Sequence, residues 1–308
     1  MIALKRGVSE KDLTLQAAIR RGVADYQAEL RRMQTGLAGE LYIDQRWEDM
    51  NLKGEYYLIH DYYVQINENI SHQIDTLFLC KNFLLLLEIK NIAGRIDFEE
   101  EKHQFIRTRD DGIVQGFRNP IDQVRRHRRW LQDFIGGSLP VEYAVVFSHS
   151  KTIIGRVPKN EAIFHGSGLE SHLYKLFSKY EAHVSSQELQ QLSQKLLKIK
   201  TEPQRKLVVD SSRIRRGVLC KKCDYQVVML FNYGKFECPT CRTRSNEGLL
   251  EALEDYRLLV SEWISNREFR MFFGIDSIDA TKRLLKSLNL EYEGSYKDRK
   301  YRIRALNL

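Results

Sequence analysis

The chain has 308 residues, of which 43% are hydrophobic and 29% are charged, so it can bury a substantial core and is long enough for two or three structural units. Basic residues outnumber acidic ones by 49 to 41, and the resulting net charge of +8 favours polyanionic partners. The longest apolar run, residues 83–87, is too short to cross a bilayer, and the charged N-terminus lacks a signal-peptide core, so we expect a cytoplasmic protein without a membrane anchor.

The first part of the chain predicts helices. A capping-box pattern at residues 9–12 begins a charged helical pattern that continues to about Met33. We expect Gly36 and Gly39 to interrupt this pattern and a second helix to cover residues 40–47. Residues 1–35 are therefore interpreted as an N-terminal helical extension.

After Gly54 the pattern changes from helical to extended. Aromatic and β-branched residues or apolar runs typical of strands occur at residues 56–66, 72–80 and 83–90. A helix is expected at residues 119–134, with Pro120 in its first turn, and a buried strand at residues 141–147. Together, residues 36–200 predict one α/β domain.

The predicted hairpin between residues 72 and 90 places two carboxylates opposite each other. If its turn lies at residues 81–82, the numbers of paired residues add up to 163, so Asp75 stands opposite Glu88. Lys90 then points to the same face as Glu88, because side chains alternate along a strand. Oxygen ligands of this kind suit Mg²⁺, which would make a bound water easier to deprotonate next to the lysine. The alternative is a surface hairpin in which Glu88 and Lys90 form an ordinary ion pair.

Four separated motifs extend this pattern. In chain order they are Gly36-Leu-Ala-Gly-Glu40, Gln73-Ile-Asp75, Glu88-Ile-Lys90-Asn91-Ile-Ala-Gly94 and Asn119-Pro-Ile-Asp-Gln123. This series resembles the nuclease-related domain family (NERD), a branch of the PD-(D/E)xK nuclease superfamily, over about residues 36–150. Ile74 stands where the superfamily's name has a proline.

The resemblance implies a mixed sheet flanked by helices and one catalytic site. It implies that Glu40, Asp75, Glu88, Lys90 and Gln123 meet there, with Asp75 and Glu88 as the Mg²⁺ ligands. The helix glutamate would support the metal or its water. The glutamine would lie behind the lysine or contact the phosphate.

Arginines cluster directly after Gln123 on the predicted helix, at positions Arg125, Arg126, Arg128 and Arg129. They cover more than half of the helix circumference, so some must face away from the site. A solvated helix face explains any single one of them, but the cluster predicts at least one phosphate contact. His127 lies among them and is expected to be structural.

Two cysteine pairs predict a zinc ribbon at residues 218–246. Fourteen residues separate the pairs, which are Cys220 with Cys223 and Cys238 with Cys241. This spacing suits four thiolates on one structural Zn²⁺, with a hairpin turning at residues 232–234 between the pairs. Reduced structural cysteines or redox pairs are the alternative. The fifth cysteine, Cys80, is expected in the core.

The remaining segments are basic. Residues 201–217 are interpreted as a linker, and residues 247–308 predict a helix over 249–264, two short helices over 266–273 and 277–288, and strands over 291–294 and 301–306. This is the outline of a winged helix, in which Thr281, Lys282 and Lys286 would face DNA. The alternative is a helical cap that completes the zinc module.

Taken together, the sequence predicts an α/β protein with a PD-(D/E)xK nuclease-like core, a zinc ribbon and a small winged-helix-like segment. The predicted function is a Mg²⁺-dependent nuclease that hydrolyses DNA, and RNA is not excluded as the substrate. The alternative is a nucleic-acid-binding or regulatory protein that uses the nuclease core as a scaffold.

Overall fold

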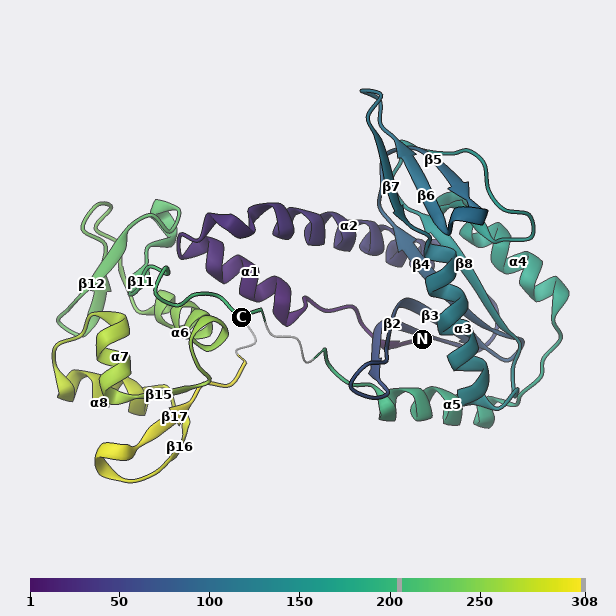
Figure 1. Cartoon of the computed structure of the whole chain (residues 1–308). Helices are drawn as coiled ribbons and strands as arrows, with labels where there is room; N and C mark the ends of the chain where they lie inside the picture. The colour runs from purple at the N-terminus through teal and green to yellow at the C-terminus, as the bar shows by residue number, and fades with distance from the viewer. Residues whose placement is uncertain (204–206, 306–308) are drawn as a thin grey trace. The chain divides into compact units, whose positions relative to one another are not determined.

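Figure 1 shows a computed structural model of the chain, which describes residues 1–203 and 207–305. The chain divides into two compact units. Unit 1 consists of residues 1–7 and 32–204, and unit 2 of residues 8–31 and 205–308. None of the described helices is long and apolar enough to cross a membrane.

Unit 1 is built on a mixed sheet with the strand order β1-β2-β3-β4-β8-β10. Its strands are β1 (Ile2–Leu4), β2 (Tyr56–Gln65), β3 (Ser71–Cys80), β4 (Leu84–Lys90), β8 (Val141–Phe147) and β10 (Ile163–His165). The central strands β2, β3 and β4 are antiparallel, whereas β4, β8 and β10 run parallel. The three predicted strands and the buried strand that follows them are confirmed.

Four helices cover the two faces of this sheet. They are α2 (Gln27–Asp49), α3 (Pro120–Ile135), α4 (Leu169–Lys179) and α5 (Ser186–Ile199). Apolar residues of α2 and α4 pack on the odd-numbered side chains of β4, and those of α3 and α5 pack on the even-numbered ones. The hydrophobic pattern of β4 is continuous because both faces are buried.

A second sheet of unit 1 has the order β7-β6-β5-β9. It comprises β5 (Gly94–Glu99), β6 (Gln104–Thr108), β7 (Val114–Arg118) and β9 (Thr152–Ile154), and it was not predicted from the sequence. Every residue of β7 is exposed, so this edge strand carries no hydrophobic alternation that would reveal it.

The expected interruption of the first long helix at Gly36 and Gly39 is wrong. The chain turns at Gly22, where φ is +97°, and α2 then runs without a break past both glycines. Gly39 has a packing role: a Cβ at this position would lie 2.4 Å from Asn91 Cβ and from Ser148 Oγ. Glycine therefore allows α2 to approach the carboxyl ends of β4 and β8.

The described part of unit 2 contains the helix α1 (Glu10–Arg20), two small sheets and three further α-helices. The strands are β11 (Val218–Leu219), β12 (Val228–Asn232), β13 (Lys235–Glu237), β14 (Arg244–Ser245), β15 (Trp263–Ser265), β16 (Glu291–Glu293) and β17 (Lys300–Arg302), and the helices are α6 (Glu247–Leu259), α7 (Asn266–Phe273) and α8 (Ile278–Ser287). One hydrophobic core joins Phe236 of the hairpin to Leu253, Phe269 and Leu285 of the helices. The hairpin and the helical end therefore fold as one body.

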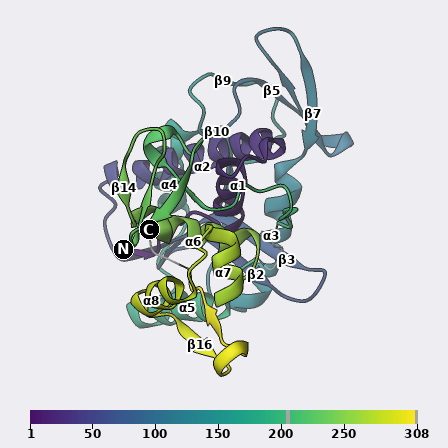
Figure 2. The same ribbon diagram turned by 90° about the vertical axis from the view of Figure 1, so that its left-hand side faces the viewer.

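The C-terminal segment has the connectivity of a winged helix. Its elements follow the order helix, strand, helix, helix, strand, strand, and β17 lies between β15 and β16 in the sheet. Figure 2 shows α7 and α8 beside this sheet. Residues 263–264, expected at the end of a helix, instead belong to β15, since they pair with β17. Parts of the predicted linker (204–206) and last strand (306) lie outside the described residues.

Candidate active site and cysteine cluster

The hairpin of β3 and β4 has the register expected from the sequence. The pairs Thr76 with Leu87 and Leu79 with Leu84 each add up to 163, so Asp75 and Glu88 follow as the next opposed positions. The regular ladder ends one pair before them. At this point the Asp75 side chain contacts β4 directly: its Oδ2 accepts a hydrogen bond of 2.6 Å from the backbone N–H of Ile89.

Glu88 is buried between two donors. Its Oε1 lies 2.5 Å from Nζ of Lys90, and its Oε2 accepts a 2.9 Å hydrogen bond from the Gln123 amide. Gln123 occupies the first turn of α3, which begins where Asn119 caps the helix and Pro120 fixes its first residue. The local sequence of this helix start thus aims Gln123 at the carboxylate.

An arginine outside the sequence motifs joins the site from the N-terminus. The strand β1 pairs with β2 and brings Arg6 to the cluster, where its side chain is only 3% exposed. Its guanidinium lies 2.7 Å from Glu40 Oε2 and 2.9 Å from Asp44 Oδ2, and it donates to the backbone carbonyl of Asp75 at 2.9 Å. Arg6 therefore ties the helix glutamate to the strand that carries Asp75.

Two further polar residues of β2, next to each other in the chain, lie near the site and were not predicted from the sequence. His60 is buried, and its Nδ1 lies 3.1 Å from Asp44 Oδ1 and 3.1 Å from Thr76 Oγ1. Asp61 interrupts the pairing of β2 with β3 directly opposite Asp75 and has φ of +48°. The one feature of the sequence that could have indicated Asp61 as a site residue is its acidic side chain within an otherwise strand-like segment.

Burial and mutual repulsion dominate the electrostatics of the carboxyl groups. Burial, followed by the nearby Asp75, raises the pKa of Glu88 to about 8. The same two causes raise the pKa of Glu40 to about 7, and burial raises the pKa of Asp75. For Lys90 the surrounding carboxylates outweigh burial and raise its pKa. The cluster thus holds more acidic groups than its two cations neutralise.

This excess of acidic groups fits a divalent cation. Asp75 and Glu88 could supply two oxygen ligands, and Mg²⁺ commonly takes its other ligands from water and phosphate. Among the described residues, however, the only group of three or more side chains whose ligand atoms lie close enough to share one metal ion consists of cysteines. The carboxylates of this site do not form such a group, so a cation here would need further ligands from water or a phosphate. Lys90 and Gln123 occupy the oxygens of Glu88 in this arrangement.

An open pocket of about 830 Å³ adjoins Lys90 and Gln123. Its wall also includes Arg126 from α3, and Phe117 and Arg118 from the end of β7. The site therefore has room for a ligand directly beside the lysine, and basic and aromatic side chains line that room.

Comparison with known proteins identifies this part of the chain. Residues 35–148 match the model of a family described as NERD, nuclease-related domain. The chain contains a nuclease-related domain. No curated protein and no solved structure matched the chain.

The matched segment of the nuclease-related domain includes Glu40, Asp75, Glu88, Lys90 and Gln123, whereas Arg6 lies outside it. The mixed α/β core and the family resemblance predicted from the sequence are both confirmed.

The four arginines of α3 in the nuclease-related domain point in different directions. Arg125 forms an ion pair of 2.5 Å with Glu161, and Arg128 lies over the Tyr143 ring at 5.5 Å from its centre. Arg126 lines the pocket, and Arg129 is exposed outside it. Only Arg126 among them therefore lies where a phosphate beside Lys90 would be.

His127 has the structural role expected for it. It is buried, and its Nδ1 lies 2.8 Å from Nδ1 of His72, which stacks on Trp130. Burial lowers the pKa of His127 to about 3, so the ring is neutral in the folded chain. Cys80 is also buried, as expected for a core residue.

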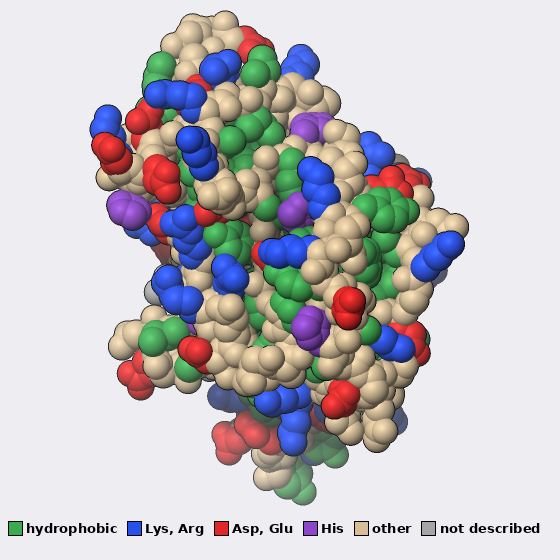
Figure 3. Space-filling view, turned by 90° about the vertical axis from the view of Figure 1, so that its right-hand side faces the viewer, with side chains coloured by type: hydrophobic (Ala, Val, Ile, Leu, Met, Phe, Trp, Pro, Cys, Tyr) green, Lys and Arg blue, Asp and Glu red, His purple; other side chains and the backbone are tan. Residues whose placement is uncertain are grey.

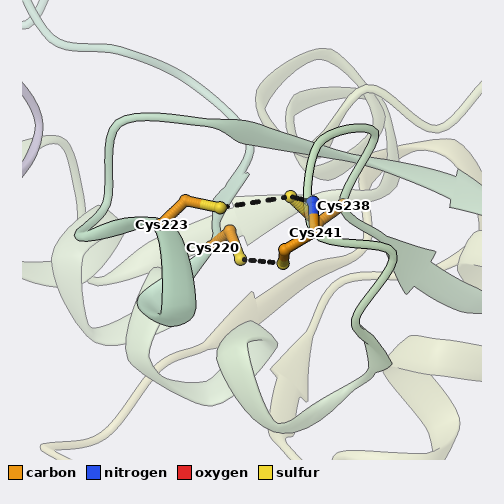
Figure 4. Close-up of side chains that lie close together, drawn as sticks. All are labelled: Cys220, Cys223, Cys238 and Cys241. Carbon is orange, nitrogen blue, oxygen red and sulfur yellow. Dashed lines mark hydrogen bonds between the residues drawn. The ribbon is translucent and has the colours of Figure 1, made fainter.

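Outside the nuclease-related domain, the four other cysteines gather in unit 2 (Figure 4). Their sulfur atoms all lie within 4.8 Å of one another, with 3.5 Å between Cys220 and Cys241 and 3.7 Å between Cys223 and Cys238. Four sulfurs about 2.3 Å from a central Zn²⁺ form a tetrahedron with edges of about 3.8 Å. The cluster is therefore compatible with a zinc ribbon.

The backbone of the two cysteine turns supports this interpretation. The residue after each second cysteine, Asp224 or Arg242, has a left-handed conformation, with φ of 50° and 60°. The backbone N–H of Cys241 also points at the sulfur of Cys238 at 3.5 Å. The two turns thus share a geometry that presents sulfurs to a common centre, and the hairpin turns at residues 233–234 as predicted.

The residues expected to read DNA on α8 separate into two groups. Lys282 and Lys286 are exposed, and so is their neighbour Arg283, which the prediction omitted. Thr281 is fully buried, so its placement on the DNA-facing side is wrong. The helical period places residue 281 on the same side as Leu285, which packs in the core of unit 2.

Proposed function

We propose that the chain is a metal-dependent nuclease that hydrolyses phosphodiester bonds in DNA. The observation that carries this proposal is the arrangement of Asp75 and Glu88 on neighbouring strands, with Lys90 on the same strand as Glu88 and an open pocket beside them. A nuclease needs two ligands for a cation and a positive group near the scissile phosphate, and this set offers both.

Each residue of the site has a separate role in this proposal. Mg²⁺, when bound by Asp75 and Glu88, would supply Lewis acidity and a water that loses a proton more easily. Lys90 stabilises negative charge that develops on the phosphate, and Gln123 fixes the orientation of Glu88. Glu40, whose pKa is raised to about 7, can accept a proton from water near neutral pH.

We propose that unit 2 binds DNA. The exposed basic side chains of α8 lie where a winged helix contacts the major groove, and the four cysteines are proposed to hold one structural Zn²⁺. Net charge alone is a weak argument for DNA binding by this chain, because basic and acidic side chains are interspersed over the face of unit 1 that Figure 3 shows. A thiolate zinc site suits a reducing compartment such as the cytoplasm.

Cleavage assays with a charge-matched control test the proposal. Labelled DNA is incubated with the wild type, Lys90→Ala and Lys198→Ala in magnesium-containing and magnesium-free buffers; Lys198 is exposed on α5. We expect magnesium-dependent cleavage by the wild type and Lys198→Ala, and a rate at least about 100-fold lower for Lys90→Ala. Chelators are avoided so that the cysteine cluster stays intact.

The second candidate is a nucleic-acid-binding or regulatory protein built on a nuclease scaffold. It is favoured by the direct contact between Lys90 and Glu88, which in this arrangement occupies a carboxylate oxygen that a metal would use. A wild-type protein that binds DNA but cuts neither DNA nor RNA with any divalent metal would establish this candidate. If the wild type cleaved RNA and not DNA, the proposed substrate would be wrong, but the protein would still be a nuclease.

A further inference from the structure

The pocket beside Lys90 has an aromatic wall as well as a basic one. Phe117 on β7 pairs directly with Phe105 on β6, and their rings stack at 5.1 Å with an angle of 16° between the planes. Phe105 is 2% exposed, whereas Phe117 is 37% exposed. One side of the Phe117 ring thus rests on a fixed support, and the ring still offers apolar surface to a ligand.

Two cations, Arg118 and Arg126, line the same pocket as this ring. Within residues 1–203 and 207–305 neither guanidinium forms an ion pair with an acidic side chain. The acidic residue of the pocket, Asp122, lies 3.1 Å from His103 instead. The pocket therefore combines uncompensated positive charge with an aromatic ring.

We propose that this pocket binds an unpaired nucleotide of single-stranded DNA, with its base stacked on Phe117 and the adjacent phosphates near Arg118 and Arg126. The volume of about 830 Å³ falls in the range of small-molecule sites. In a duplex both faces of a base are covered by its neighbours, so only an unpaired base can stack on the ring. This inference rests on the proposed function and names its substrate class: DNA that is single-stranded at the position of cleavage.

Binding of a fluorescent single strand tests the stacking. An oligonucleotide with 2-aminopurine is titrated with the full chain in buffer containing Ca²⁺ and no Mg²⁺, beside a blunt duplex of the same sequence. We expect Phe117→Ala to weaken single-strand binding by about 5- to 150-fold and to abolish part of the fluorescence quenching, with duplex binding unchanged. Phe117→Trp should retain both properties.

The control for the aromatic ring is Tyr174→Ala, because Tyr174 is 55% exposed on α4 and does not line the pocket. For the charge, Arg126→Gln is compared with Lys175→Gln on the same control helix. Arg126→Gln should reduce the slope of log K against log salt by about 0.7 for single strands, and Lys175→Gln should leave it unchanged.

The outcomes separate this inference from the proposed function. Equal effects of Phe117→Ala on single strands and duplex, or no effect on either, would overturn the inference even if the wild type cleaves DNA. Loss of single-strand binding in Phe117→Ala, with duplex binding unchanged, would support it even if the wild type never cuts. A single-stranded RNA that binds with the same Phe117 dependence and displaces the DNA would overturn its assignment to DNA.

Discussion

Replacing Glu88 by glutamine tests whether this carboxyl group is strained in the folded chain. Glu88 is 2% exposed and lies close to Asp75, and these two causes raise its pKa from 4.5 to about 8. One pKa unit corresponds to about 1.4 kcal/mol, so the ionised carboxylate costs the folded state on the order of 5 kcal/mol at alkaline pH. Glutamine keeps the shape of the side chain and removes this charge, and it replaces one of the two acceptor oxygens by an NH2 donor.

The sign of the pH dependence follows from which state binds the proton more tightly. The folded state keeps the Glu88 proton up to about pH 8, whereas the unfolded chain releases it near pH 4.5. The contribution to stability is therefore complete below pH 4.5 and is lost as the pH rises toward 8. The free energy of unfolding of the wild type should fall across this window in the absence of divalent metal, and that of Glu88→Gln should fall much less.

Denaturant titrations at several pH values measure this difference. Trp47 and Trp130 belong to unit 1, and replacing Trp263 of unit 2 by phenylalanine makes the fluorescence specific for unit 1. Mg²⁺ should stabilise the wild type at alkaline pH by binding only the folded state, and it should stabilise Glu88→Gln less. If the free energy of unfolding depended on pH in the same way in both proteins, the prediction that burial raises the pKa of Glu88 would be refuted.

Three further predictions concern other parts of the chain. Arg6→Met should lower the DNA cleavage rate at least about tenfold, because the ion pair that orients Glu40 is lost. The control Lys5→Met changes an exposed lysine and should leave the rate unchanged. Equal rates for the two variants would show that Arg6 has no role in catalysis. Cys238→Ser should lower the zinc content measured by atomic absorption and the melting temperature of unit 2; a stable, zinc-free wild type would contradict the ribbon. Asp255→Asn should lower the free energy of unfolding of unit 2 by about 3–5 kcal/mol, because Arg21 is fully buried 2.8 Å from Asp255 and would lose this acidic partner. A loss below about 1 kcal/mol would contradict this.

Local patterns in the sequence were sufficient for the central hairpin. The two-residue turn fixes the register of β3 and β4, because it requires the numbers of paired residues to add up to 163. That register places Asp75 opposite Glu88 without any tertiary information. The start of α3 was equally predictable, because Asn119 and Pro120 determine the first turn locally.

Residues that enter the site from distant segments could not be predicted in this way. Arg6 reaches Glu40 only because β1 pairs with β2, and such a pairing leaves no mark in a three-residue strand. Phe117 could not be predicted either, because it lies on an exposed strand and its ring is held in place by stacking on Phe105 of the neighbouring strand.

The sequence by itself determined the chemistry of this protein: which carboxylates oppose each other, which lysine accompanies them, and which four cysteines can share a metal. These features depend on spacing along one or two neighbouring elements. The tertiary structure decided which charges are buried and which surfaces are open, including the burial of Thr281 and the separate directions of the arginines on α3. Burial and pocket shape arise from contacts between distant segments, because side chains far apart in the sequence compete for the same core.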